Sequence, residues 1–248
     1  MRILVLSDIH ANLTALEAVL KDAGNVDATW CLGDVVGYGP DPNECIARLR
    51  MLPNFLCLLG NHDAAALGYI QLEAFNTDAR RSIEWLQSVL TPESLAFLKD
   101  LPEMIKVEPL DVTLAHGSPR NPVWEYILDL HSAIQNFKHF DTRVCMVGHT
   151  HLPIAYLLED KGSEDLPDIH WLLPEEGQVL MLAGRAIVNP GSTGQPRDHD
   201  PRASYAIFTP ETFTWVIHRV EYDIPSVQKR IKEQDLPARH ALRLTNGW

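Results

Sequence analysis

The sequence predicts an α/β protein with a single domain, in which two β-sheets form a mixed β-sandwich flanked by helices. In the first part of the chain, apolar runs of strand length alternate with helical patterns, which is typical of a parallel sheet with right-handed crossovers. From residue 152 onward the pattern changes to shorter β-like runs, which we expect to form hairpins of a second sheet. With 248 residues and 46% hydrophobic residues, the chain can bury a substantial core.

The elements of the first part follow from local patterns. Core strands are expected at the apolar runs 2–6, 29–32, 55–59, 111–115 and 143–147. A helix with one apolar face follows the first run, a short helix is expected near 43–51, and the stretch 76–100 is helical by pattern. Within that stretch, Thr91 and Pro92 predict the N-cap and first position of a second helix. We interpret 64–100 as a helical insertion that forms a lid, a dimer surface or plain packing.

The second part, about 152–235, is predicted to contain strands and a final helix. The β-like runs extend from "IAYLL" to "TFTWVIH", and the spacing of Ile224, Val227 and Ile231 predicts the helix. The acidic stretch 159–168 is expected to be a solvated loop. No linker interrupts the chain, so we expect one domain over residues 1–248.

The composition argues against several classes of protein. The net charge of −12 disfavours broad nucleic-acid binding, and no apolar run is long enough for a transmembrane helix. The first apolar run is too short for a signal peptide, so we expect a cytoplasmic protein. The four cysteines lack CxxC spacing and are expected to be buried, reduced thiols.

Each predicted core strand ends in side chains that bind metals or transfer protons. These side chains are Asp8, His10, Asp34, Asn61, His62, Asp63, His116, His149 and His151. Because ligand sites of open α/β sheets form at the carboxyl ends of strands, we expect them to converge. A turn or helix cap explains any one ending equally well, but five coincident endings favour a metal site.

The chemistry of this set narrows the choice of metal. Two carboxylates, an amide oxygen and four imidazoles, without thiolate, suit Mn, Fe, Co, Ni or Zn better than Ca or Mg. Seven ligands exceed the needs of one catalytic ion and fit two divalent transition-metal ions with a bridging carboxylate. We expect Mn²⁺ first among these ions. The local positive charge of such a site attracts phosphoryl oxygens despite the acidic composition.

At these residues the sequence resembles the calcineurin-like metallophosphoesterase superfamily. The five ordered blocks are "SDIH" (7–10), "GDVVGYG" (33–39), "GNHD" (60–63), "AHGS" (115–118) and "GHTH" (148–151). A later stretch, "VNPGSTGQPRD" (188–198), is similar to the compact prokaryotic, phosphodiesterase-like branch. The resemblance therefore covers most of the chain and implies the fold of that superfamily.

The resemblance also implies a role for each residue of the blocks. The first metal would be held by Asp8, His10 and His151, and the second by Asn61, His116 and His149. Asp34 would bridge the two ions. His62 would act as the general acid, with Asp63 orienting its ring or raising its pKa.

One departure from the protein-phosphatase branch concerns substrate choice. Gly37 and Tyr38 occupy the places of an Asp and of a phosphate-clamping Arg, which favours phosphodiesters over more highly charged monoesters. Tyr38 is expected either to pack against a nucleobase or an aromatic leaving group, or to fill space. Arg197 and Arg202 either replace the missing clamp or pair with neighbouring aspartates.

The function that we expect is that of a dinuclear metal-dependent phosphoesterase acting on phosphodiesters. A metal-bridging hydroxide would attack phosphorus, and His62 would protonate the leaving oxygen. The alternatives are a phosphomonoesterase or dinucleoside-polyphosphate hydrolase and, disfavoured by the complete ligand set, a non-catalytic protein-interaction scaffold. The expected partner is a small phosphate-ester or nucleotide-like substrate, and the sequence leaves the oligomeric state open.

Overall fold

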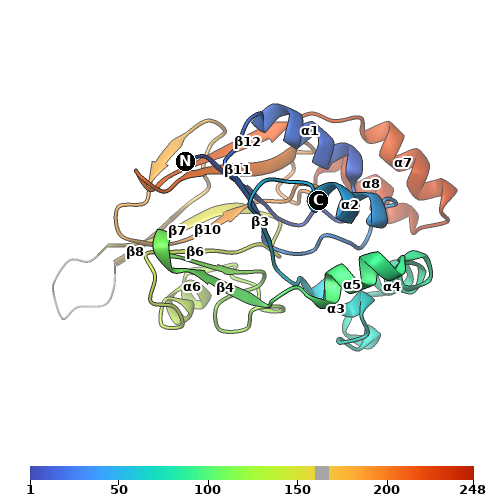
Figure 1. Ribbon diagram of the computed structural model, residues 1–248, viewed down its shortest axis with the longest axis horizontal. Coiled ribbons are helices and arrows are strands. Elements are labelled where there is room, and N and C mark those ends of the chain that lie inside the picture. Colours follow the sequence, from blue (N-terminus) through green and yellow to red (C-terminus); the bar gives the residue numbers. More distant parts are fainter. Residues whose placement is uncertain (160–167) are drawn as a thin grey trace.

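The computed structural model describes residues 1–159 and 168–248, which form two six-stranded sheets (Figure 1). The strands of the first sheet are, in spatial order, β3 (Phe55–Cys57), β2 (Ala28–Cys31), β1 (Ile3–Leu6), β11 (Ala203–Thr209), β12 (Thr214–Val220) and β9 (Val179–Met181). Those of the second sheet are β4 (Met104–Val107), β5 (Val112–Ala115), β6 (Val144–Met146), β10 (Arg185–Pro190), β7 (Pro153–Glu159) and β8 (Asp168–Leu172).

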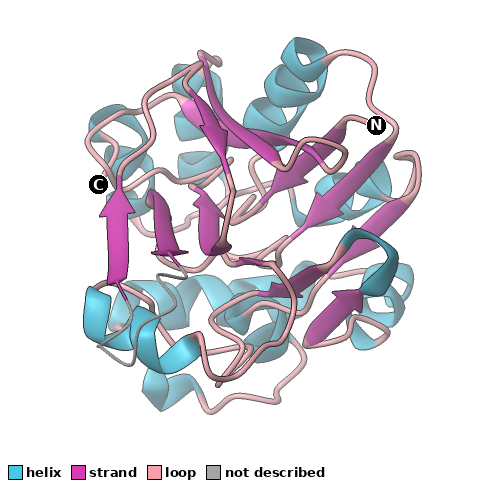
Figure 2. Ribbon diagram, turned by 90° about the vertical axis from the view of Figure 1, so that its left-hand side faces the viewer, coloured by secondary structure: helices cyan, strands magenta, loops and turns pink. Residues whose placement is uncertain are grey.

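Helices lie outside the two sheets (Figure 2). They are α1 (Leu13–Ala23), α2 (Pro42–Leu49), α3 (Asn61–Ala66), α4 (Thr77–Val89), α5 (Pro92–Lys99), α6 (Leu130–Asn136), α7 (Ile224–Glu233) and α8 (Ala238–Asn246). Two short 3₁₀ turns, Leu72–Ala74 and Glu108–Leu110, complete the described elements.

Strand alternation places one apolar layer between the sheets and another under the helices. In β1, Ile3 and Val5 pack into the core between the sheets, whereas Leu4 and Leu6 pack against the helices of the first sheet. Because both faces of this strand are covered, it reads as a continuous apolar run. The predicted two-sheet sandwich with outer helices is confirmed.

The prediction that the later strands form a separate second sheet is wrong. β11 pairs antiparallel with β1, and β10 pairs parallel with β6, so the later strands extend both of the parallel groups. The physical reason is that each parallel group ends in an open edge whose backbone N–H and C=O groups need partners. Strands β4 and β8 were not predicted, and the acidic stretch 160–167 lies outside the described residues.

The predicted helices in 76–100 and near Ile224–Ile231 are present, and the structure adds one that was not predicted. The stretch 76–100 forms α4 and α5, and the Thr91 hydroxyl accepts a hydrogen bond from the Ser94 N–H as an N-cap. The predicted final helix is α7, but α8 follows it and was not predicted. All four cysteines are buried and free, as expected. Within residues 1–159 and 168–248, no helix has the length and hydropathy needed to cross a membrane.

Candidate metal centre and active site

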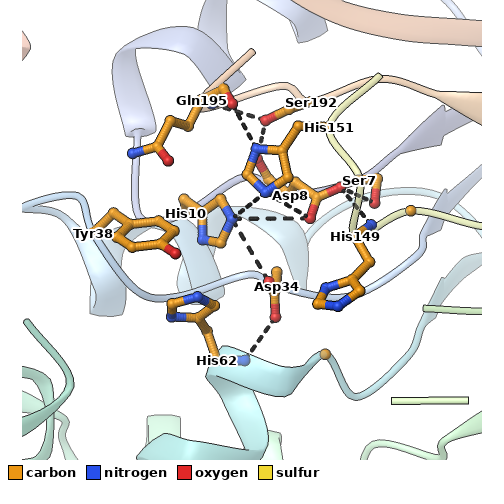
Figure 3. Close-up of polar contacts among 12 residues, drawn as sticks. Ser7, Asp8, His10, Asp34, Tyr38, His62, His149, His151, Ser192 and Gln195 are labelled. Atoms are coloured by element: carbon orange, nitrogen blue, oxygen red, sulfur yellow. Dashed lines mark hydrogen bonds and ion pairs between the residues drawn. The ribbon is translucent and has the colours of Figure 1, made fainter. Parts of the chain in front are cut away.

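In the loops that follow the core strands, several residues have the left-handed backbone conformation. Asp8 and Asp34 both have φ of 53°, His10 has 47°, His149 has 64° and His151 has 60°. Left-handed φ costs roughly 1–3 kcal/mol at a non-glycine residue and persists only where the surroundings enforce it. These turns direct the side chains toward one another (Figure 3).

The first cluster consists of three hydrogen-bond acceptors without a hydrogen between them. His10 Nδ1 lies 3.1 Å from the carbonyl oxygen of Val36, and His151 Nδ1 lies 2.5 Å from that of Gln195, so both Nδ1 atoms donate. The two Nε2 atoms therefore carry lone pairs, yet they lie only 3.2 Å apart. Asp8 Oδ1 lies 3.3 Å from His151 Nε2 and receives no hydrogen bond.

The second cluster repeats this arrangement. His116 Nδ1 donates to the Leu32 carbonyl at 2.8 Å, and His149 Nε2 donates to the Trp124 carbonyl at 3.2 Å. The remaining ring nitrogens, His116 Nε2 and His149 Nδ1, lie 3.1 Å apart. Asn61 Oδ1 is also 3.1 Å from His116 Nε2, which gives a second group of three acceptors.

Protonation does not resolve these contacts, because burial lowers the pKa of His10, His149 and His151 well below the usual value and keeps them neutral. Burial also raises the pKa of Asp8 to about 7, because its charged form is poorly solvated there. A cation in each cluster satisfies all three lone pairs at once. The residues present therefore fit a metal site.

Asp34 lies between the two clusters. Its Oδ2 is 3.6 Å from His10 Nε2 and 3.5 Å from His116 Nε2, while its Oδ1 accepts the backbone N–H of His62 at 2.8 Å. Burial raises its pKa well above the usual value. One carboxylate oxygen therefore faces both groups of acceptors, as a bridging ligand requires. All seven predicted ligand residues are brought together.

His62 lies beside this centre at the start of α3. Its ring packs against the rings of Tyr38 and Phe75 at centroid distances of 4.3 and 5.2 Å, and its buried Nδ1 has no hydrogen-bond partner. The ring also lies against Gly37, where an added Cβ would be 2.6 Å from His62 Nδ1 and φ is +97°. Glycine at position 37 is thus required by the position of the imidazole.

The expectation that Asp63 orients His62 or raises its pKa is wrong. The Asp63 carboxylate accepts hydrogen bonds from the backbone N–H groups of Val35, Val36 and Gly60 at 3.3, 3.0 and 3.0 Å. Asp63 is the N3 residue of the capping box of α3, so its carboxylate bonds back to the Gly60 N–H. Burial moreover lowers the pKa of His62 well below its usual value. Asp63 thus fixes the loop that carries Asp34.

The three predicted substrate-binding residues have different positions. Tyr38 is only 7% exposed, and its ring packs against His10, His62 and His240, so it is not open to a nucleobase. The half-buried Arg197 reaches the Tyr38 hydroxyl at 3.5 Å and acts electrostatically on the site histidines. Arg202 instead forms ion pairs with Asp200 and Glu176. The pair with Asp200 is the second of the two alternatives expected for this arginine, pairing with a neighbouring aspartate.

Several supporting residues were not predicted as site residues. Ser7 and Ser192 donate to the Asp8 side chain and carbonyl at 2.7 and 2.8 Å, and Asn189 donates to the Gly148 carbonyl at 2.7 Å. Ser192 and Asn189 lie in the "VNPGSTGQ" stretch, which was the available signal. Tyr126, whose ring stacks on His149 at 3.7 Å and is 44% exposed, had no signal in the sequence.

The comparisons with known proteins agree with this site. The family model described as the calcineurin-like phosphoesterase superfamily domain matches residues 1–212, and the chain belongs to this superfamily. It is accordingly a metal-dependent hydrolase of phosphoric esters. The crystal structure of a metallophosphoesterase from Sphaerobacter thermophilus is 48% identical, with a TM-score of 0.88 over 100% of this chain and 99% of that chain.

Two curated relatives differ in how much of the chain they match. An uncharacterized protein from Methanocaldococcus jannaschii is 39% identical over 95% of this chain and 93% of its own length. A symmetrical bis(5′-nucleosyl)-tetraphosphatase from Proteus mirabilis is 28% identical over 49% of this chain and 45% of its own length. The predicted family and fold are therefore confirmed, and the substrate is left to the proposal below.

Proposed function

We propose that the protein is a dinuclear phosphodiesterase that holds two divalent transition-metal ions, with Mn²⁺ as the first candidate. The observation that carries the proposal is the pair of acceptor-only clusters joined by one oxygen of Asp34. The ligands of one ion would be Asp8, His10 and His151, and those of the other Asn61, His116 and His149. Ions held there supply Lewis acidity, which activates a water nucleophile and neutralises charge on the phosphoryl oxygens.

The protein's own residues would supply orientation and a proton. His62 protonates the leaving oxygen, and its ring is held beside the proposed centre by packing against Tyr38 and Phe75. Although burial lowers its pKa in the free protein, an anionic ester beside the ring favours the protonated form and opposes that shift. Asp63 keeps the loop of Asp34 in place, and Arg197 attracts the phosphoryl group.

The preference for diesters rests on the loop at 37–38. With glycine at position 37 and a buried tyrosine at 38, this loop has no guanidinium for a terminal phosphate dianion. A second candidate function, hydrolysis of dinucleoside polyphosphates, is favoured by the partial match to the bis(5′-nucleosyl)-tetraphosphatase. Both candidates use the same metal centre and differ in what binds beside it.

The test is to strip the purified protein, reload it with Mn²⁺, count bound metal, and assay bis-p-nitrophenyl phosphate beside p-nitrophenyl phosphate. Two ions per chain and faster diester turnover are expected. His62→Asn should lower turnover roughly 10²- to 10⁴-fold while retaining both ions. Loss of metal in that variant would make His62 a ligand, and faster monoester turnover would refute the diester preference.

Asp34→Asn provides the test of bridging. Since one oxygen of Asp34 faces both clusters, the variant should lose affinity for both ions together. Titration with Mn²⁺, followed by metal analysis after gel filtration, measures each step. Selective loss of one ion would show that Asp34 does not bridge.

A further inference from the structure

A cavity of about 430 Å³ lies next to the metal centre and is not used by the proposed chemistry. Its walls come from two loops, one after α3 with Tyr69, Ile70 and Ala74, and one after β5 with Val123 and Trp124. Its volume lies within the roughly 300–1,000 Å³ that is usual for small-molecule sites. The lining is mostly apolar, with Glu103 and Asn121 as polar groups.

A chain of ring contacts connects this cavity to the reaction centre. The Phe75 ring lies 5.2 Å from the His62 ring and 5.3 Å from the Trp124 ring, edge to face in both cases. Trp124 lines the cavity, and its carbonyl oxygen accepts the hydrogen bond that fixes His149. The Trp124 wall of the cavity is therefore linked to His62 through the Phe75 ring and to His149 through its own carbonyl group.

The chemistry of the cavity indicates what it binds. Tyr69 lines the cavity and is 62% exposed, so its ring is accessible for stacking with a ligand. A planar, uncharged ring stacks on tyrosine and tryptophan, whereas the carboxylate of Glu103 repels a phosphate. Glu103 and Asn121 also line the cavity, and their side chains carry hydrogen-bond acceptors that suit amino groups at the edge of such a ring.

We infer that this cavity, between Tyr69 and Trp124, is a subsite for the nucleobase of a nucleotide substrate. The inference rests on the proposed function, because the phosphate of that nucleotide would lie at the metal centre. It names the substrate class as nucleoside-containing phosphoesters and makes Tyr69 and Trp124 specificity-determining residues.

The experiment compares two ligands that differ only in the base. Isothermal titration calorimetry of the Mn²⁺-loaded protein measures Kd for AMP and for ribose 5-phosphate. Base stacking predicts that AMP binds about 5- to 150-fold more tightly. Tyr69→Ala and Trp124→Ala should bring the ratio toward one, and Trp124→Phe should retain most of it.

The matched control is Phe97→Ala. Phe97 is a half-buried aromatic residue that lines another apolar cavity, of about 570 Å³, which shares no lining residue with the proposed subsite. This variant should keep the wild-type ratio of the two Kd values. Circular dichroism melting curves of all variants confirm that they are folded before the ratios are compared.

Three outcomes would overturn the inference: equal Kd values for the two ligands in the wild type, ratios unchanged by Tyr69→Ala and Trp124→Ala, or concentration-dependent dimers abolished by Tyr69→Ala. The last outcome would assign the cavity to a second copy of the chain. Because calorimetry measures binding without turnover, a failure of the proposed function can be distinguished from a failure of the base subsite. Turnover of small diesters without base preference refutes only the subsite, and base preference without turnover refutes only the proposed phosphodiesterase function.

Discussion

Bound metal should raise the thermal stability of this protein by a large and calculable amount. Each cluster holds three lone-pair donors within about 3.3 Å of a neighbour, an arrangement that a cation stabilises in the folded state alone. Free metal at 100 times Kd adds about 2.7 kcal/mol per site. Two such sites add about 5 kcal/mol, and a domain of this size gains roughly 2–4 °C per kcal/mol, so Tm should rise by roughly 10–20 °C.

The measurement is differential scanning calorimetry with EDTA and then with saturating Mn²⁺. In His151→Ala, one of the clusters loses an imidazole, so the metal-induced increment should fall to about half of the wild-type value. His139→Ala is the matched control, since His139 is exposed and lies outside both clusters. Only the increment is compared, so any effect of the substitution on the metal-free protein cancels.

Two results would refute this reasoning. The first is a wild-type Tm that Mn²⁺ does not change after EDTA has been removed. The second is a His151→Ala increment equal to that of the wild type, which would mean that the metal binds elsewhere. A His139→Ala increment below that of the wild type would identify an additional site.

Three further predictions concern single residues. Gly37→Ala should lower turnover at least tenfold with metal retained, because the added Cβ displaces the His62 ring; activity assays with metal analysis decide this. Arg197→Ala should raise KM severalfold while Arg202→Ala leaves it unchanged, and equal effects would contradict the assignment. In the metal-free protein, the raised pKa of Asp8 means that the folded state binds the proton up to about pH 7, so stability falls as pH rises from about 4 to 7. Asp8→Asn should remove roughly 4 kcal/mol of that fall in urea titrations across this range, and an unchanged pH dependence would refute the origin given.

The core strands and the convergence of their endings were predictable because both are local signals. A strand covered on both faces shows as an uninterrupted apolar run, and parallel strands bring their carboxyl ends to one edge. Asp8 and Asp34 follow β1 and β2, which are parallel neighbours, so their proximity followed once the strands were placed. The same reasoning placed His116 and His149 after β5 and β6, which are also parallel neighbours.

The remaining features depend on contacts between distant parts of the chain. Nothing in the sequence shows that β11 pairs with β1, since pairing of a free sheet edge depends on which later strand reaches it. The Trp124 carbonyl that holds His149 is a backbone group, and any residue at that position carries one. The role predicted for Asp63 was wrong for a local reason, because a carboxylate in the first turn of α3 accepts backbone N–H groups of the helix start.

The proposed metal centre and the proposed base subsite lie in different parts of the structure. Main-chain carbonyls of Leu32, Val36, Trp124 and Gln195 orient the histidines of the two clusters, and the seven proposed ligand residues are at most 3% exposed. Side-chain changes at the surface therefore leave these hydrogen bonds in place. The proposed base subsite, in contrast, depends on the exposed side chain of Tyr69 in a loop that contributes no ligand. Substitutions there can alter which ester is hydrolysed without changing the metal centre, because the two sets share only Trp124, through its backbone in one case and its ring in the other.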